Sequence, residues 1–212
     1  MPSLPTVHTV VMRVWLPDRP GALGQVASRI GAVKGDVLDI EILETGAGRA
    51  VDELVVALPD HGLVELMISE VHAIDGVSVE HVREISGEHN DGGLLALSLA
   101  AELAEAKPER RLDSLIDAIT KITEADWVLV ARGPETVAAI GEAPSADWLH
   151  SLLAGSRHLG DPHATANDLF WSDMPVSGLW LAAGRKERPV HVRERVRLDL
   201  FVRIADALPL DV

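Results

Sequence analysis

The first 85 residues alternate between runs with strand periodicity and two stretches with helix periodicity. Apolar residues at steps of three and four predict helices that begin near Leu23 and near Leu63. The remaining runs are rich in β-branched residues or alternate between apolar and polar positions, as half-buried strands do. The predicted strands are His8–Leu16, Val37–Leu43, Ala50–Leu58 and Val77–Ile85. The order is strand–helix–strand–strand–helix–strand, which predicts four antiparallel strands with both helices on one face.

The second half starts with longer helical patterns. Residues 92–107 (GGLLALSLAAELAEAK) are rich in helix formers and stop at Pro108, and apolar positions between Leu112 and Ile122 keep helical spacing. Further elements are expected at Asp126–Arg132, Thr136–Ile140, Leu169–Trp171 and Gly178–Gly184 as strands and at Ala146–Leu153 and Val192–Leu208 as helices. In the last helix, apolar residues recur at steps of four, at Val196, Leu200, Ile204 and Leu208. This half predicts a second small α+β domain.

The best candidate for a domain boundary is Ser86–Gly93 (SGEHNDGG), a polar segment with three glycines in eight residues. Before it, strands and helices alternate, and after it a long helix begins. We therefore expect a first domain at residues 1–87, a linker at 88–93 and a second domain at 94–212.

Composition and charge exclude several functions. Thirty-three acidic and 19 basic residues give a net charge of −14, which disfavours nucleic acid and anionic membrane surfaces as partners. The chain has no cysteine, so disulfides, thiolate metal sites and cysteine nucleophiles are excluded. No apolar run reaches about 18 residues, and the first ten residues lack the pattern of a secretory signal. We therefore expect a cytoplasmic protein.

The segment Asp18-Arg-Pro-Gly-Ala-Leu23 lies between the first strand and the first helix. This string, within a βαββαβ unit, resembles the ACT domain over about residues 8–85. The resemblance implies a ferredoxin-like fold, a regulatory role in amino-acid metabolism, and edge-to-edge pairing into a homodimer that holds an amino acid at the paired interface. The implied ligand-binding residues are Asp18, Arg19, Pro20, Gly21, Ala22 and Leu23 of the turn and Asp36, Val37 and Leu38 of the second strand.

The physical chemistry of this turn is compatible with such a ligand. Gly21 has no Cβ, so a ligand can approach the backbone closely. The first amides of the following helix lack intrahelical partners and favour a carboxylate. Asp18 could accept the ammonium group of an amino acid. The alternative is a structural turn in which Asp18 caps the helix.

A second resemblance concerns the end of the chain. Gly184–Pro189 (GRKERP), followed by Arg193-Glu-Arg195 and a Leu-rich helix, is similar to the end of GAF domains, and the order of elements is similar to small GAF-like or PAS-like sensory domains. The absence of cysteine excludes a covalent bilin. The charged residues of the last helix are expected on a solvated surface. These are Arg193, Glu194, Arg195 and Arg197.

Other groups of polar residues give weaker evidence for a functional site. His150, His158, Asp161, His163 and Asp168 could suit a divalent metal, but their spacing matches no metal signature, and a solvated loop is the favoured interpretation. The chain has no nucleophile elbow, phosphate loop or dinucleotide-binding motif. We expect no catalytic residues, no metal and no cofactor. The tryptophans are expected in the second core, and Phe170 with Trp171 is the alternative place for a pocket.

The sequence therefore predicts a non-enzymatic regulatory protein. Its ACT-like domain would bind an amino acid or similar small metabolite at a dimer interface, and its GAF-like domain would relay the signal or add a binding surface. Two alternatives stay open. One is a structural dimerisation or assembly module that binds no ligand and docks on a partner enzyme. The other is an unrecognised enzyme that uses the loop between His158 and Asp168.

Overall fold

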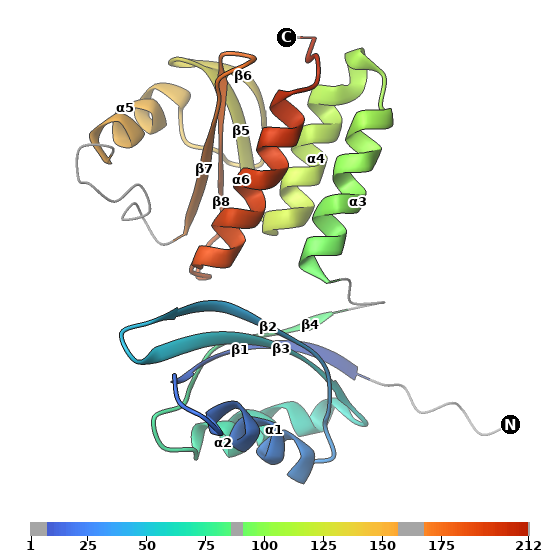
Figure 1. Cartoon of the computed structure of the whole chain (residues 1–212), viewed down its shortest axis with the longest axis vertical. Helices are drawn as coiled ribbons and strands as arrows, with labels where there is room; N and C mark the ends of the chain where they lie inside the picture. The colour runs from blue at the N-terminus through green and yellow to red at the C-terminus, as the bar shows by residue number, and fades with distance from the viewer. Residues whose placement is uncertain (1–7, 86–90, 157–167, 212) are drawn as a thin grey trace, which may run out of the picture. The chain divides into compact units, whose positions relative to one another are not determined.

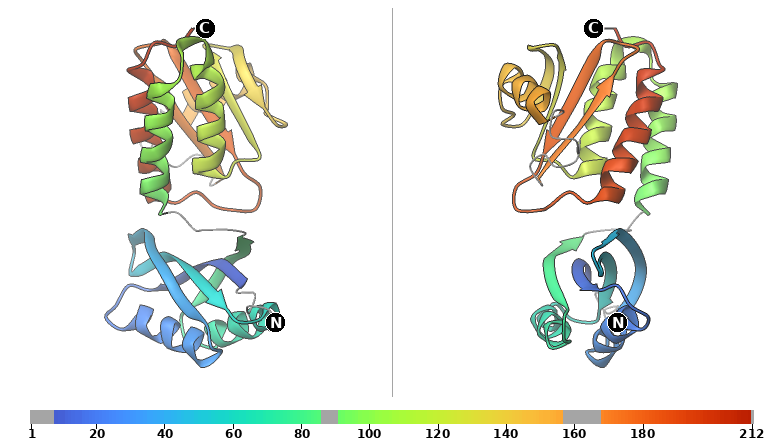
Figure 2. Two further views of the ribbon diagram at one scale, coloured as in Figure 1. Left: turned by 90° about the vertical axis from the view of Figure 1, so that its right-hand side faces the viewer. Right: turned by 60° about the vertical axis from the view of Figure 1, so that its left-hand side comes forward.

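The alternating runs of the first half form one antiparallel sheet, and both helical stretches cover the same face of it (Figures 1 and 2). The structure is a computed structural model that describes residues 8–85, 91–156 and 168–211. The chain divides into two units, Met1–His89 and Asn90–Val212. The elements of the first unit are β1 (His8–Pro17), α1 (Ala22–Ala32), β2 (Asp36–Gly46), β3 (Arg49–Leu58), η1 (His61–Leu63), α2 (Val64–His72) and β4 (Ser78–Ile85).

The strand order of the first sheet is β2-β3-β1-β4, which confirms the predicted ferredoxin-like arrangement. β1 is central and pairs antiparallel with β3 from His8 opposite Leu58 to Pro17 opposite Arg49. Because side chains alternate between faces, every second residue of β1 and β3 points toward the helices. These residues form one core with the inner faces of α1 and α2, including Val14, Leu54 and Val26.

The second unit contains a second four-stranded antiparallel sheet, of order β6-β5-β8-β7. Its elements are α3 (Gly92–Glu105), η2 (Pro108–Arg110), α4 (Arg111–Thr123), β5 (Trp127–Arg132), β6 (Glu135–Ile140), α5 (Ala146–Ser156), β7 (Leu169–Met174), β8 (Leu179–Gly184) and α6 (Val192–Asp206). α3 begins at Gly92 with Asp91 as its cap, so the last two residues of the predicted linker belong to the helix. Residues 88–90 lie outside the described residues.

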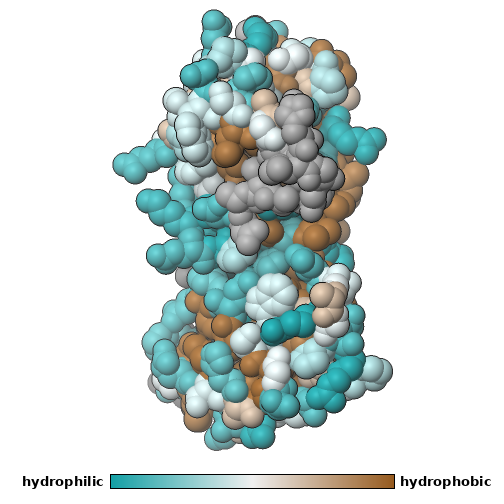
Figure 3. All heavy atoms as spheres, turned by 90° about the vertical axis from the view of Figure 1, so that its left-hand side faces the viewer, coloured by the Kyte–Doolittle hydropathy of each residue, from teal (hydrophilic) through white to brown (hydrophobic). Residues whose placement is uncertain are grey.

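Helices cover both faces of the second sheet (Figures 1 and 2). α3, α4 and α6 pack on one face around residues such as Val130 and Leu181, and α5 packs on the other around Leu129 and Ala182. All six residues of β8 are buried for this reason. In the view of Figure 3, polar side chains cover most of the surface of each unit, and smaller patches of apolar residues are exposed among them. No described helix is long and apolar enough to span a membrane.

The tryptophans do not all lie in the core. Trp180 is buried against α5 and donates from its ring nitrogen to the carbonyl of Gly133 at 2.8 Å. Trp148, on α5, is exposed, which contradicts the expectation of a core position. Because α5 has only one face against the sheet, Trp148 lies on the solvent side while Leu149 is buried.

The orientation of α6 differs from what its sequence suggested. Leu198, Phe201, Val202 and Ala205 face the core, whereas the predicted apolar series at steps of four lies largely on the outside, where Val196, Leu200 and Ile204 are exposed. Glu194 and Arg195 are buried, which contradicts the prediction of a solvated charged surface. The helix has two apolar stripes, and spacing alone does not determine which of them faces the sheet.

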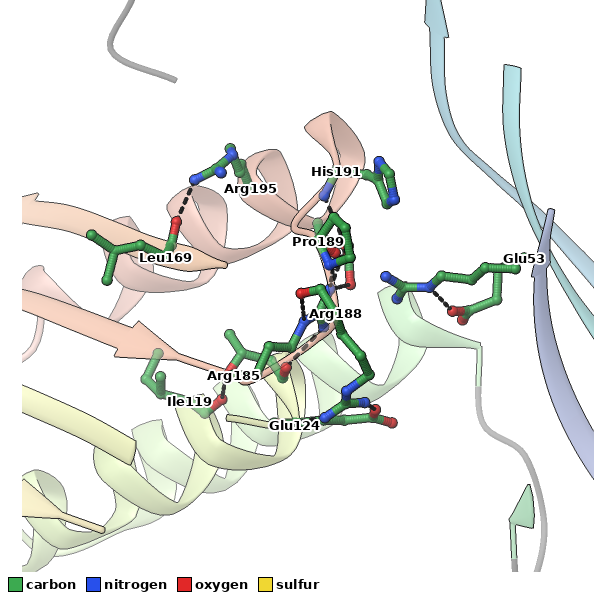
Figure 4. Close-up of polar contacts among 12 residues, drawn as sticks. Glu53, Ile119, Glu124, Leu169, Arg185, Arg188, Pro189, His191 and Arg195 are labelled. Carbon is green, nitrogen blue, oxygen red and sulfur yellow. Dashed lines mark hydrogen bonds and ion pairs between the residues drawn. The ribbon is translucent and has the colours of Figure 1, made fainter. Parts of the chain in front are cut away.

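Burial of these charges is explained by a network around Arg185, at the end of β8 (Figure 4). The Arg185 guanidinium donates to both carboxylate oxygens of Glu194 at 2.8 Å and to the carbonyls of Thr123, Arg188 and Pro189. Glu194 also accepts from the His191 backbone at the start of α6. The network therefore fixes the end of β8 to the end of α4 and the first turn of α6.

Substitution Arg185→Met is expected to destabilise the second unit by about 3–5 kcal/mol, because it leaves the Glu194 carboxylate buried without its cation. Urea unfolding followed by tryptophan fluorescence measures the change. Lys186→Met is the matched control, since the Lys186 side chain is exposed and its variant should unfold within about 0.5 kcal/mol of the wild type. Equal stability of the two variants would contradict a structural role for the network.

Candidate functional site

The predicted ligand-binding turn connects the central strand β1 to α1. Gly21, the residue before the helix, has left-handed backbone with φ of 86°, which glycine adopts without strain. The Asp18 N–H donates to the carbonyl of Gly48 at 2.9 Å, which holds the turn against the β2–β3 hairpin. The turn and this hairpin therefore lie at the same end of the sheet.

α1 starts without a side-chain cap. Gly21 offers no capping oxygen, and the first turn of the helix contains no acidic residue. The N–H of Ala22 is satisfied by the carbonyl of Arg19 at 3.2 Å, and the first helical bond runs from Gln25 to Gly21. The amides of Leu23 and Gly24 have no intrahelical acceptor at this position, and they lie at the positive end of the helix dipole.

Asp18 does not cap this helix. Its carboxylate forms no hydrogen bond or ion pair with any described residue. The alternative in which Asp18 caps the helix of a structural turn is therefore wrong about the cap. The Asp18 carboxylate is instead a negative group beside the uncapped helix end.

A second carboxylate, that of Asp52 on β3, lies at the same end of the sheet. Asp52 is opposite Val14 in β1, and its side chain points to the helix-covered face. It is 2% exposed, and its Oδ1 atom has no hydrogen-bond partner among the described residues. Burial raises the pKa of this carboxyl, and the negative charge of Asp18 raises it further.

Sequence reasoning missed Asp52, although a signal was present. Along β3 the inward positions are Ala50, Asp52, Leu54, Val56 and Leu58. One acidic residue in an otherwise apolar series is unusual because buried carboxylates are costly without a partner. The neighbouring acid shows the contrast, since Glu53 points to the other face and pairs with Arg13 at 2.5 Å.

The outer side of the turn opens into a hollow of about 480 Å³ between α1 and the end of α2. Its lining includes Gly21 and Gly24 of the helix start, together with Arg19, Arg29 and Asp75. A Cβ built at Gly21 would meet no atom within 4 Å, so the space beside this residue is open. A small molecule can therefore reach the start of α1 from solvent.

The predicted residues of β2 lie elsewhere. Asp36 and Leu38 are exposed and Val37 is half-buried. Asp36 is opposite Ala57, which in turn is opposite Thr9 at the far end of β1. Eight residues of strand, or roughly 26 Å, separate this end of the sheet from the turn. Within one chain, the predicted ligand residues of the turn and those of β2 therefore do not lie close together.

The second unit has a smaller candidate site. A hollow of about 250 Å³ lies where an alternative pocket was expected, lined by Phe170, Trp171, Ser172, Asp173, Arg195, Leu198 and Asp199. Arg195 has a structural role there, because it donates a hydrogen bond to the carbonyl of Leu169 at 2.6 Å (Figure 4). Of the predicted histidine and aspartate cluster, His158, Asp161 and His163 lie outside the described residues. The described residues hold no group of three potential metal ligands.

The strand order β2-β3-β1-β4 gives residues 8–85 a ferredoxin-like fold, which is compatible with the predicted resemblance to the ACT domain. Among solved structures, the chain is similar to the ACT domain of GTP pyrophosphokinase from Chlorobium tepidum, at 15% identity over 41% of this chain and 94% of that one, with a TM-score of 0.31. It is also similar to the uncharacterised protein TM1266 of Thermotoga maritima, at 18% identity over 38% of this chain and 99% of that one, with a TM-score of 0.31.

A third similar structure covers more of the chain. It is described as a proposed transcriptional repressor of the glycine cleavage system, with 8% identity over 84% of this chain and 79% of that one and a TM-score of 0.35. No protein-family model and no curated protein matches the sequence. The GAF-like character of the second unit stays a prediction.

Substitution Gly21→Ala tests the geometry of the turn. It is expected to destabilise the first unit by about 1–2 kcal/mol, because alanine is strained in left-handed backbone. Gly31→Ala is the matched control within the same helix, where the backbone is helical and a Cβ meets nothing within 4 Å. That variant should gain about 0.5–1 kcal/mol. Equal effects in thermal or urea unfolding would contradict the assigned turn.

Substitution Asp52→Asn tests the buried carboxyl. Since the folded-state pKa of Asp52 is raised, the folded protein binds its proton more tightly than the unfolded chain. Wild-type stability should therefore fall as the pH rises from about 4, the ordinary aspartate pKa, through the raised value. Asp52→Asn should remove this fall, so that the variant is more stable at pH 7 and equal to wild type at low pH.

The control for Asp52→Asn is Glu65→Gln, on the exposed side of α2. Its unfolding free energy should follow the wild-type pH profile within about 0.5 kcal/mol. An Asp52→Asn variant that is less stable than wild type at pH 7 would show that the carboxylate has a stabilising partner.

Proposed function

We propose that this chain is a regulatory protein, without a reaction of its own, that binds an amino acid or a similar zwitterionic metabolite at the start of α1. The observation that carries the proposal is the uncapped N-terminus of α1 next to two carboxylates without cationic partners, Asp18 and Asp52. The expected ligand residues of the turn are Asp18, Arg19, Pro20, Gly21, Ala22 and Leu23.

In this proposal, the N-terminus of α1 binds the carboxylate group of the ligand. The amides of Leu23 and Gly24 point along the helix axis toward the turn, and the helix dipole favours an anion there. Gly21 has open space beside it, so a carboxylate can come within hydrogen-bond distance of the backbone. Arg19 lines the same hollow and adds positive charge.

Asp18 and Asp52 would bind the ammonium group of the ligand. Asp52 raises the free energy of the folded protein while it is charged and unpaired, and an ammonium group from a ligand would remove that penalty. The negative charge of Asp18 adds to burial in raising the pKa of Asp52, and the ammonium group of the proposed ligand would offset both negative charges. A molecule that carries an amine and a carboxylate a few bonds apart satisfies both halves of the site.

A second copy of the chain would complete this site. Asp36, Val37 and Leu38 lie at the far end of the sheet from the turn in the same chain, so they can contribute only from a partner. β2 is an edge strand with exposed Leu38 and Ile42, which suits edge-to-edge pairing. The ligand would then favour the paired arrangement and shift its population, and the second unit would relay this change.

The second candidate function is an assembly module that pairs through β2 and binds no ligand. The exposed apolar residues of this edge strand favour it, because such an edge is a template for pairing whether or not a ligand is present. The two candidates differ in one outcome. Only the regulatory protein changes its stability when an amino acid is added.

Thermal unfolding of the full chain with each of the twenty amino acids at millimolar concentration tests the proposed function. We expect at least one to raise the melting temperature of the first unit, by an amount that corresponds to about 2.7 kcal/mol at one hundred times its Kd. The N-acetylated and decarboxylated analogues of that amino acid should have no effect, because each lacks one of the two charged groups.

Substitutions in the site provide the control for this experiment. Asp18→Asn and Asp52→Asn should each weaken the ligand by about tenfold or more in calorimetric titration, since a hydrogen bond to a charged group contributes about 1.5–3 kcal/mol. Glu65→Gln should leave the Kd unchanged. A melting temperature that none of the twenty amino acids moves would leave the assembly module as the better account.

A further inference from the structure

The buried carboxyl group of Asp52 is not satisfied by the fold. Its residue is 2% exposed, and its Oδ1 atom has no hydrogen-bond partner among the described residues. Asp52 also forms no ion pair within the part of the chain that the structure describes. A buried carboxylate in this situation is costly, whereas the neutral carboxyl group has a much smaller penalty. The free protein therefore favours a proton on this group.

The elements around Asp52 offer it no cation. In the sheet, Asp52 lies opposite Val14 of β1 and Ile42 of β2. The sides of α1 and α2 that pack on this face of the sheet are apolar and consist of Ala22, Val26, Ile30, Met67 and Val71. None of these residues titrates, so the ionisation of Asp52 depends on its burial and on charges in the β1–α1 turn.

Two charged residues of that turn are relevant. Burial raises the pKa of Asp52, and the negative charge of Asp18 raises it further. Arg19, the next residue, lines the hollow on the outer side of the turn and forms no ion pair with either aspartate. The turn therefore opposes the ionisation of Asp52 in the free protein.

An ammonium group is the second way to remove the penalty, and this step rests on the proposed function. A cation that donates hydrogen bonds stabilises the carboxylate and not the neutral carboxyl group. The proton must therefore leave before the ammonium group can pair with Asp52. The O–H bond of the carboxyl group breaks, the proton goes to water, and the carboxylate accepts from the ammonium group.

We propose that a proton and the ammonium group of the amino acid compete for the carboxylate of Asp52, so that the affinity of the site for its ligand falls as the solution becomes more acidic. Acid then stabilises the empty protein, and binding releases a proton. By linkage, the occupancy of the regulatory site depends on the pH as well as on the concentration of the amino acid.

Other titrating groups are separable from Asp52. The two charged groups of a free amino acid do not titrate between about pH 4.5 and 7.5. Among the described histidines of the first unit, His8 and His61 contact each other at the far end of β1, and His72 is exposed. His81 lies opposite Arg13, whose side chain points to the other face of the sheet. A variant at Asp52 therefore isolates the contribution of this carboxyl group.

Calorimetric titration of the full chain tests the competition, with the amino acid that gives the largest thermal shift among the twenty as the probe. Between about pH 7.5 and 4.5, the Kd should rise by up to about tenfold per pH unit once the pH is below the pKa of Asp52 in the free protein. At a pH equal to that pKa, two buffers of different ionisation enthalpy should show the release of about half a proton per bound probe.

Three variants assign the effect. Asp52→Asn should bind the probe with a Kd that does not change with pH, release no proton, and approach the wild-type Kd at the acidic end of the range. Asp18→Asn should move the midpoint of the profile to lower pH, because the charge that raises the pKa of Asp52 is gone. Glu65→Gln, on the exposed side of α2, is the matched control and should keep the wild-type profile.

The outcomes separate this inference from the proposed function. A probe that binds wild-type protein with the same Kd throughout the range and releases no proton would overturn the competition and leave the proposed function standing. A pH dependence that persists in Asp52→Asn would also overturn it, because another group would then be responsible. If none of the twenty amino acids binds, the proposed function itself fails, and the competition fails with it.

Discussion

The amides at the start of α1 have no capping side chain because the chain reverses tightly between β1 and α1. Gly21 adopts left-handed backbone, and the Asp18 N–H bonds to Gly48 in the β2–β3 hairpin. α1 therefore begins without a capping side chain, at the end of the sheet where Asp52 is buried. A longer connection could supply a capping side chain to these amides, and the site would then have nothing to offer a carboxylate.

In the proposed function, stability and ligand binding oppose each other at this end of the sheet. A buried carboxylate without a partner, next to a second negative charge, destabilises the folded state at neutral pH. The apolar core that β1 and β3 form with α1 and α2 offsets this penalty. In the second unit the buried acid Glu194 has the opposite role, because Arg185 satisfies both of its oxygens and the pair fixes three elements.

The elements of both units were predictable from the sequence because their signals are local. Alternation identified the strands, and the glycine-bearing turn identified the start of α1. Asp52 could not be found in the same way, since its burial depends on β3 lying between two other strands in a particular register. The outward orientation of Leu200 and the burial of Arg195 likewise depend on which stripe of α6 the sheet accepts. The spacing of apolar residues identifies both stripes of α6, but it does not show which of them packs against the sheet.

The ionisation of Asp52 is the most direct test of the account, and carbon-13 NMR of the aspartate carboxyl groups measures it. In the free protein, Asp52 should titrate above the ordinary aspartate pKa of about 3.9. With a bound amino acid its pKa should fall, because the ligand ammonium stabilises the charged form. An Asp52 that titrates at or below the ordinary value in the free protein would contradict the account, since its carboxylate would then already have a partner.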